Sequence, residues 1–160
     1  MIHGHIFEAI DTALAILPPA MSSKPARAML LAMGLQESRF KHRRQIRGPA
    51  RGYWQFEMGG GVRGVLNHHA TAKHARHLLQ SLNYDPDKIT LEQVYDTLEH
   101  NDVLAAGFAR LLLWTLPASL PQAGEHQRSW EQYISAWRPG KPHRQTWDAF
   151  YDTAWGHLND

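Results

Sequence analysis

Apolar side chains recur at intervals of three and four residues along much of the chain, which is the spacing of amphipathic helices. The first such series covers residues 6–17 and stops at two successive prolines. A second series follows Ser22 or Ser23, either of which can act as the N-cap, and Pro25 is tolerated in its first turn. This second helix is predicted to end near Glu37.

The periodicity disappears between residues 38 and 61, where basic residues, aromatic residues and glycines follow one another. The Tyr-Trp-Gln-Phe cluster at 53–56 argues against disorder, because aromatic side chains can bury a large surface. Ordered loops of this length in a compact domain are usually functional. We therefore expect a long active-site loop, or a small hairpin, after the helix that carries Glu37.

The remainder of the chain is also predicted to be helical. Thr90 and Gln93 form a capping box, and Asn101 or Asp102 caps a helix that is apolar nearly all round, which indicates a central core helix. The predicted helices cover residues 62–82, 90–98, 103–116, 129–136 and 145–158. No alternating run is long enough for a substantial sheet. The expected fold class is mainly α, with a single domain over residues 1–160.

Composition narrows the classes of protein to which the chain can belong. With 160 residues, of which 43% are hydrophobic, it can bury the core of one domain. The absence of cysteine excludes disulfides, thiolate zinc sites and thiol nucleophiles. His74 and His77 could share a helix face, but no carboxylate or cysteine at suitable spacing completes a metal site. We expect no metal and no cofactor.

The formal net charge of +2 suits an acidic partner, such as an anionic cell-wall polymer, a nucleic acid or an anionic membrane surface. The N-terminal residues lack the basic segment of a signal peptide, and Glu8 and Asp11 interrupt their apolar positions. No apolar run reaches membrane-spanning length. We expect a monomer that is made in the cytoplasm without an export signal and does not insert stably into a membrane. Another component must then deliver it to any substrate outside the membrane.

Glu37 is the candidate catalytic residue. Cleavage of a glycosidic bond needs a carboxylic acid that stays protonated near neutral pH, and burial at the edge of a cleft raises a carboxyl pKa in this way. Glu37 lies where an apolar helix gives way to an aromatic loop. A glutamate at a helix end is by itself more often a solvated structural residue. Its neighbours in the sequence therefore decide the interpretation.

Glu37 lies in the first of two motifs that follow one another along the chain. Residues 36–40 read Gln-Glu-Ser-Arg-Phe, and residues 52–55 read Gly-Tyr-Trp-Gln. They resemble the E-S-x-F and G-L-M-Q signatures of soluble lytic transglycosylases and goose-type lysozymes. Asn101, followed by Ala-Ala-Gly at 105–107, resembles the N-x-x-x-A-G-x-x-x-L helix of this family in a looser form. The resemblance covers about residues 28–140.

A fourth block departs from the family pattern. Residues 135–140 occupy the place of its A-A-Y-N-A-G block, but Trp137 stands at the position of the tyrosine that helps to hold the acid, and Arg138 replaces the asparagine. Tyr133 lies one helical turn earlier and could supply the hydroxyl group instead. A structural role for this tyrosine is the alternative.

The resemblance implies a lysozyme-like fold that binds peptidoglycan glycan strands and cleaves the β-1,4 bond between N-acetylmuramic acid and N-acetylglucosamine, with Glu37 as general acid and base. Glu57 stands where goose-type lysozymes have an aspartate that is thought to position water. Activation of water by Glu57 would give hydrolysis, whereas lytic transglycosylases use one acid and leave a 1,6-anhydro end. A loop-anchoring role for Glu57 is the alternative.

The other candidate substrate-binding residues share the motifs or lie near the altered block. Sugar rings stack on aromatic side chains, and Gln55 offers both a donor and an acceptor to sugar hydroxyl groups. The alternative for Trp54 is that it packs the loop onto the core. The full set is Ser38, Tyr53, Trp54, Gln55, Tyr133 and Trp137.

Two other functions remain open. The basic residues of 39–51 could contact nucleic-acid phosphates while Tyr53 and Trp54 stack on bases, but this leaves Glu37 and Gln55 unexplained, and we expect no nucleic-acid partner. A structural part of a virus particle or secretion machine could recognise glycan without cutting it, which the altered fourth block would allow. The combination of features is otherwise typical of a bacteriolytic phage lysin, either released from the host cytoplasm through a holin or carried in the virion.

Overall fold

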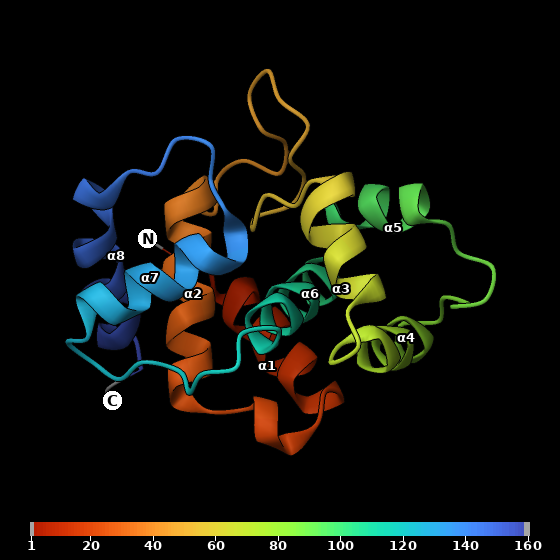
Figure 1. The fold of residues 1–160 in the computed structure, drawn as a ribbon, viewed down its shortest axis with the longest axis horizontal. Helices are drawn as coiled ribbons and strands as arrows, with labels where there is room; N and C mark the ends of the chain where they lie inside the picture. The colour runs from red at the N-terminus through yellow and green to blue at the C-terminus, as the bar shows by residue number, and fades with distance from the viewer. Residues whose placement is uncertain (1, 159–160) are drawn as a thin grey trace.

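Helices make up most of the chain, and the computed structural model describes residues 2–158 (Figure 1). The α-helices are α1 (Gly4–Ile16), α2 (Lys24–Ser38), α3 (Arg63–Asn67), α4 (Ala72–Ser81), α5 (Leu91–Leu98), α6 (Asp102–Trp114), α7 (His126–Trp137) and α8 (Arg144–Gly156). Two further helical turns are the 3-10 turn η1 (Pro19–Met21) and the π-helical turn η2 (Met58–Val62). The mainly α prediction is confirmed. Residues 1 and 159–160 of the predicted domain lie outside the described residues.

Helix α6 forms the centre of the fold, as its apolar sequence predicts. All residues from Leu104 to Leu113 are buried, and the helix contacts α1, α2, α3, α4, α5 and α7. Gly107 lets α4 approach closely, because a Cβ added there would lie 2.3 Å from Leu78 Cδ2. Asn101 caps the helix, since its Oδ1 accepts a hydrogen bond from the Leu104 N–H at 3.0 Å.

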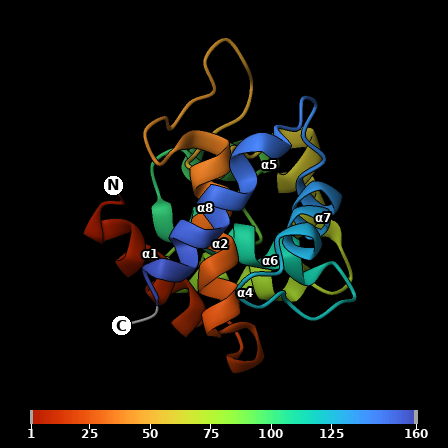
Figure 2. The same cartoon turned by 90° about the vertical axis from the view of Figure 1, so that its left-hand side faces the viewer.

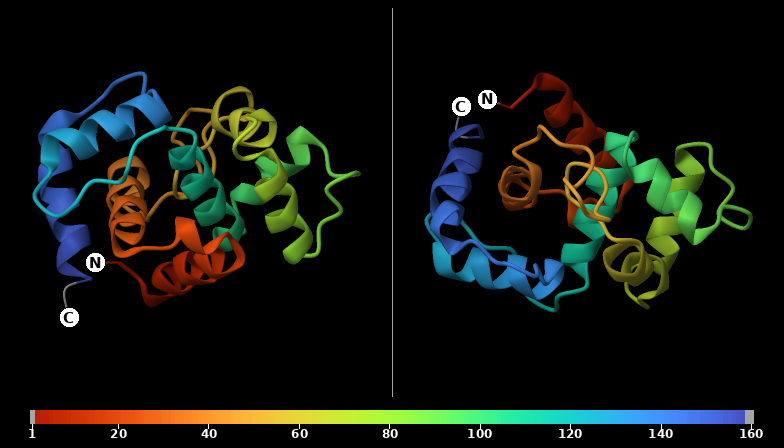
Figure 3. Two further views of the ribbon diagram at one scale, coloured as in Figure 1. Left: turned by 60° about the horizontal axis from the view of Figure 1, so that its bottom comes forward. Right: turned by 90° about the horizontal axis from the view of Figure 1, so that it is seen from above.

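The remaining helices lie on two sides of this centre. Figures 1 and 3 show α3, α4 and α5 on one side, α7 and α8 on the other, and α1, α2 and α6 between them. Figure 2 shows α8 lying along α2, with which it makes extensive contact. Buried side chains from all eight helices join one hydrophobic core. Within residues 2–158, no helix combines the length and apolarity needed to cross a membrane.

The predicted helix starts are found where capping residues occur. Ser23 caps α2, because its Oγ accepts a hydrogen bond from the Ala26 N–H at 3.1 Å. Thr90 and Gln93 form the capping box of α5, with hydrogen bonds in both directions. Helices α7 and α8 are both present, and each begins before the predicted residue.

The segment between α2 and α3 is shorter and less sheet-like than predicted. Among the described residues it contains no strand, only isolated bridges that pair Arg51 with Arg44 and with Phe56. Its last glycines belong to η2 rather than to a loop. Gly61 allows this tight coil to pack on Phe56, because an added Cβ would lie 2.6 Å from the Phe56 ring.

The single helix predicted over 62–82 is divided into α3 and α4. Side chains stabilise the break between them. The Thr71 hydroxyl donates a hydrogen bond to the Val65 carbonyl at 2.7 Å, and His68 Nδ1 accepts one from the Ala70 N–H at 3.0 Å. These side-chain hydrogen bonds compete with the backbone hydrogen bonds of a continuous helix. They depend on single polar residues, which the spacing of apolar positions does not reveal.

Candidate active site

Glu37 lies in the last turn of α2, where its side chain is mostly buried. Its Oε2 accepts a hydrogen bond from the Tyr133 hydroxyl of α7. Burial raises the pKa of Glu37 to about 7, the Tyr133 hydrogen bond opposes this rise, and the negative charge of Glu57 adds to it. Such a carboxyl group exchanges its proton near neutral pH, as a general acid and base must.

Tyr133 is fixed by the aromatic rings around it. Its ring stacks on Trp147 of α8 with centroids 4.9 Å apart and an interplanar angle of 9°, and the Trp130 ring lies 5.6 Å away. Burial and the charge of Glu37 raise the pKa of the Tyr133 hydroxyl, so it remains a hydrogen-bond donor. The hydroxyl group that contacts the acid therefore comes from Tyr133 rather than from the position of Trp137.

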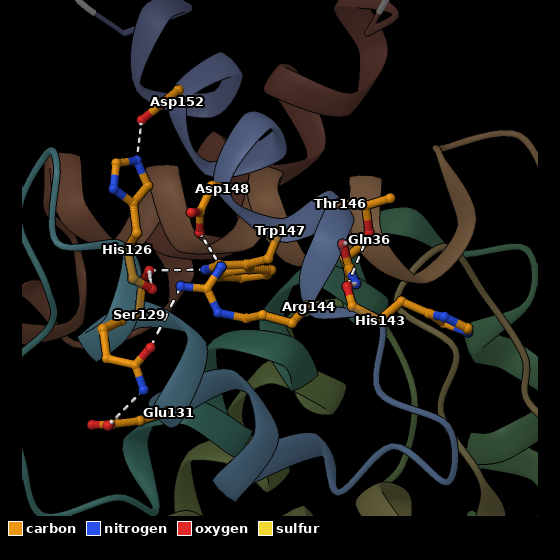
Figure 4. A network of polar contacts seen from close by, with 11 residues as sticks. Gln36, His126, Ser129, Glu131, His143, Arg144, Thr146, Trp147, Asp148 and Asp152 are labelled. Atoms are coloured by element: carbon orange, nitrogen blue, oxygen red, sulfur yellow. Dashed lines mark hydrogen bonds and ion pairs between the residues drawn. The ribbon is translucent and has the colours of Figure 1, made fainter.

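Polar contacts fasten α8 to the helices that carry the acid and its tyrosine (Figure 4). Gln36 Nε2 donates a hydrogen bond to the His143 carbonyl, and Gln36 Oε1 accepts one from the Thr146 hydroxyl, both at 2.9 Å. Trp147 Nε1–H donates to Ser129 Oγ of α7 at 2.9 Å. Helices α2, α7 and α8 are thus joined by side chains directly beside the acid.

The first motif turns the chain sharply after the acid. Ser38 Oγ donates a hydrogen bond to the Tyr53 carbonyl at 2.7 Å and accepts one from the Phe40 N–H at 3.1 Å. The Phe40 ring packs against Gly34, where an added Cβ would lie 2.0 Å from the ring. Ser38 is buried and its hydroxyl group is occupied, so the geometry supports a structural role, and its predicted contact with substrate stays a prediction.

The second motif fastens the loop to the core. Gly52 has a φ of +76°, and an added Cβ would lie 2.6 Å from the Leu98 carbonyl oxygen, so this position favours glycine. Trp54 is 0% exposed, and its Nε1–H donates a hydrogen bond to the Leu30 carbonyl at 2.8 Å. This ring has no accessible face for a sugar to stack on, so the geometry supports the alternative that Trp54 packs the loop onto the core.

Tyr53 is likewise a packing residue. It is 7% exposed, its ring meets Phe40 edge-on, and the Arg43 guanidinium group lies 4.4 Å from the ring centroid. These contacts support a structural role for Tyr53, and its place in the substrate site stays a prediction. Gln55 differs, because it is only half-buried and lines the cavity described next.

A cavity of about 560 Å³ lies between η2, the C-terminal end of α6 and the end of α7. Glu37 is not one of its lining residues, but Trp137 is, and the Trp137 ring lies 6.3 Å from the ring of Tyr133. The structure thus gathers Gln55, Glu57 and Trp137 around the cavity. The lining consists of Gln55, Phe56, Glu57, Gly59, Gly60, Gly61, Gly64, His68, Leu112, Thr115, Leu116, Ser135, Ala136, Trp137 and Arg138.

Trp137 has two roles in this arrangement. Its Nε1–H donates a hydrogen bond to the Trp54 carbonyl at 2.9 Å, and its ring packs against Phe56 at 5.8 Å, so it holds the loop to the end of α7. Part of the ring faces the cavity. Glu57 is exposed on the same cavity and precedes η2. Its charge acts on the Glu37 pKa, which puts the two carboxyl groups within electrostatic range.

The sequence predictions missed the glycine-rich side of the cavity. Gly59, Gly60 and Gly64 line it, and a Cβ added at Gly59 or Gly64 would meet no heavy atom within 4 Å. Three consecutive glycines soon after Gln55 and Glu57 were the available signal. Arg138 also lines the cavity and is exposed, with a left-handed backbone at φ 48°.

Several basic residues of the loop are neutralised by acidic partners. Arg43 forms a bidentate ion pair with Asp102, with N···O distances of 2.6 and 2.9 Å. Arg44 and Arg51 both contact Glu99, at 2.7 and 3.5 Å. Trp54 and Tyr53 are buried as well, so these three arginines and both rings hold the loop to the rest of the fold.

Among the described residues, no group of three or more histidine, cysteine, aspartate or glutamate side chains could hold a metal ion. His68 stacks on His69 with ring centroids 4.4 Å apart. No family model, curated protein or solved structure matches the chain. The chemistry must therefore be inferred from the geometry of the site and from the two motifs.

Proposed function

We propose that the protein is a lysozyme-like glycosidase that cleaves the β-1,4 bond between N-acetylmuramic acid and N-acetylglucosamine in peptidoglycan. The observation that carries the proposal is the Glu37 carboxyl group, which is mostly buried, hydrogen-bonded by Tyr133 and raised in pKa to about 7, partly by the charge of Glu57, which lines the cavity. The order of the motifs at 36–40 and 52–55 supports the choice of substrate.

In this mechanism Glu37 donates its proton to the glycosidic oxygen as the bond from that oxygen to the sugar breaks. The acid becomes a carboxylate, and the Tyr133 hydroxyl group stabilises it by the hydrogen bond that it already donates. Gln55 and the exposed part of Trp137 contact the sugar. Arg138 lies where it can bind a carboxylate of the peptide stems.

Glu57 is assigned to the activation of water, which makes hydrolysis the expected reaction. Its position on the cavity and its electrostatic effect on Glu37 support a second carboxylate near the acid. A water molecule deprotonated by Glu57 would attack the anomeric carbon and leave a reducing end. Without that base, the sugar's own C6 hydroxyl group attacks and leaves a 1,6-anhydro end.

Substitution of the acid tests the main proposal. Glu37→Gln keeps the shape of the side chain but removes the proton donor, so lysis of outer-membrane-stripped bacteria should fall at least about a thousandfold. Glu131→Gln on the exposed face of α7 is the matched control and should lyse like the wild type. A wild type that is inert over a wide range of pH and salt, or a Glu37→Gln variant that lyses equally, would refute the proposal.

The masses of the fragments released from purified peptidoglycan test the role of Glu57. Reducing ends from the wild type are expected. Glu57→Gln should lose the hydrolytic product while still binding the glycan. Exclusively 1,6-anhydro ends from the wild type would assign the protein to the lytic transglycosylases and remove Glu57 from water activation.

The two other functions have distinct signatures. A nucleic-acid-binding protein would show binding that falls steeply with salt and no muralytic activity, and the paired arginines and buried rings of the loop give this function little support. A structural protein would bind glycan without cutting it. Within the main proposal, the biological role that we infer is that of a phage lysin, acting in the periplasm and cell wall after holin release or virion delivery.

A further inference from the structure

A second cavity, of about 660 Å³, lies beside the C-terminal half of α6. It is bounded by η1, the start of α2 and the segment that follows α6, and its lining shares only Leu116 with that of the cavity that Glu57 lines. Its residues are Ala20, Ser23, Pro25, Arg110, Leu113, Trp114, Leu116, Pro117, Ala118, Ser119, Leu120 and Gln122. Most of this surface is apolar.

Arg110 is the residue of this cavity whose presence is not explained by packing alone. The side chain is 3% exposed, yet it lines the cavity. Its Nε–H donates a hydrogen bond to the Met21 carbonyl at 2.7 Å, and its guanidinium carbon lies 5.4 Å from the centroid of the Trp114 ring. These contacts orient the guanidinium group and occupy one of its five N–H donors.

No acidic side chain among the described residues pairs with Arg110 by a hydrogen bond or an ion pair. Burial lowers the pKa of Arg110 to about 10, with no nearby negative charge to oppose the shift. Arg43, by contrast, is bound through both terminal nitrogens by Asp102. A buried charge without a partner is costly, so a counter-ion from outside the chain would relieve it.

We propose that this second cavity binds a small organic monoanion, a carboxylate attached to an apolar group. The terminal N–H groups of Arg110 receive the carboxylate, and Pro25, Leu113 and Trp114 surround the apolar part. A monoanion fits better than a phosphate dianion, because Arg110 is the one charged residue in the lining. This site is separate from Glu37 and does not depend on the proposed glycosidase activity.

Calorimetric titration of the full chain with acetate, butyrate and hexanoate tests the proposal. We expect affinity to rise with the length of the alkyl chain, and hexanoate to raise the melting temperature because it binds the folded state. Arg110→Met, which removes the charge and keeps an apolar stem, should weaken hexanoate binding at least tenfold. Arg76→Met on the exposed side of α4 is the control and should bind like the wild type.

A second variant keeps Arg110 and blocks the cavity, in case Arg110→Met fails to fold. Ala20 is exposed at the rim, so Ala20→Trp places an indole over the opening and should also abolish binding. No binding of any of the three carboxylates to the folded wild type would overturn the proposal. So would equal binding of inorganic phosphate and hexanoate, or hexanoate binding that survives both substitutions.

Discussion

The two sides of the cavity that Glu57 and Trp137 line are built differently. On one side, α7 presents Trp137 and supports the acid through Tyr133, whose ring is stacked on Trp147. On the other side, η2 and the start of α3 present glycines whose missing side chains leave open space. The α7 side fixes side chains in position, and the glycine side leaves room for a glycan strand.

This difference suits the proposed cleavage of a polymer. The proton donor must be held within a fraction of an ångström of its productive position, which packed rings and paired hydrogen bonds provide. The strand must also enter and leave, and bare backbone at Gly59 and Gly64 offers the least obstruction. We therefore expect substitutions on the aromatic side to disturb the proposed catalytic step, and substitutions on the glycine side to disturb access of the strand to the cavity.

Among the variants that test this difference between the two sides, Tyr133→Phe should have the largest effect. Loss of the hydroxyl removes the hydrogen bond that lowers the Glu37 pKa, so this pKa should rise above about 7 and the alkaline limb of the pH profile should move upward. The carboxylate left after proton transfer also loses a donor, and kcat should fall by about a hundredfold, or roughly 3 kcal/mol. An unchanged pH profile, measured as lysis against pH, would contradict the assigned role of Tyr133.

Glu37→Gln should make the fold more stable at alkaline pH. The folded-state pKa of Glu37 is about 7, above the ordinary glutamate value of 4.5, so the folded state holds more protons between these values and stability falls as pH rises through this range. The variant does not ionise, and it should gain about 2–3 kcal/mol over the wild type at pH 8 and much less at pH 4. Urea unfolding at both pH values measures this difference, and equal differences at both would contradict the raised pKa.

Gly64→Leu should narrow the open side without weakening the fold. A Cβ at this position meets nothing within 4 Å, and leucine favours the helix more than glycine does, so stability should rise by about 0.5–1 kcal/mol. The leucine side chain enters the cavity and should lower kcat/KM for polymeric peptidoglycan by about tenfold.

Gly61→Ala is the matched comparison for the same side. Its Cβ would lie 2.6 Å from the Phe56 ring, and it should destabilise the fold by about 1–3 kcal/mol. Thermal melts and initial lysis rates distinguish the two glycines. If Gly64→Leu lyses at the wild-type rate, the glycine side is not the path of the strand.

Trp137→Phe should have the smallest effect. Phenylalanine retains the packing on Phe56 but cannot donate to the Trp54 carbonyl, so the free energy of unfolding should fall by about 1 kcal/mol. Denaturant unfolding measures the loss, and Trp137→Ala shows how much of the ring's contribution is packing. A stability equal to that of the wild type would mean that the loop is held without this bond.

Local signals in the sequence predicted much of the fold. Ser23, the Thr90 and Gln93 capping box and the apolar residues of α6 each act through neighbours in the chain, and each prediction is confirmed. The division of the helix over 62–82 was missed because the Thr71 and Val65 contact depends on one hydroxyl group rather than on apolar spacing.

The site was predicted less completely, for a related reason. Motif order selected Glu37, Gln55 and Glu57 together, and the structure brings the last two to one cavity, with the charge of Glu57 acting on the Glu37 pKa. Motif order could not decide whether the ring of Trp54 faces a sugar or the core, because an irregular loop has no periodicity that assigns a side chain to a face. The contact of Tyr133 with Glu37 spans 96 residues, and no local pattern encodes it.

That long span has a consequence for when the surroundings of Glu37 form during synthesis. The bonds that fix the acid join residues 36, 37 and 54 to residues 133–146, across sequence separations of 83 to 110 residues. Such contacts form late in folding, because the entropic cost of closing a long segment of chain comes before the stabilisation that packing gives. Until α7 docks, Glu37 lacks the hydrogen bond that the Tyr133 hydroxyl group donates. A nascent chain therefore completes the surroundings of Glu37 only after α7 and α8 have been made.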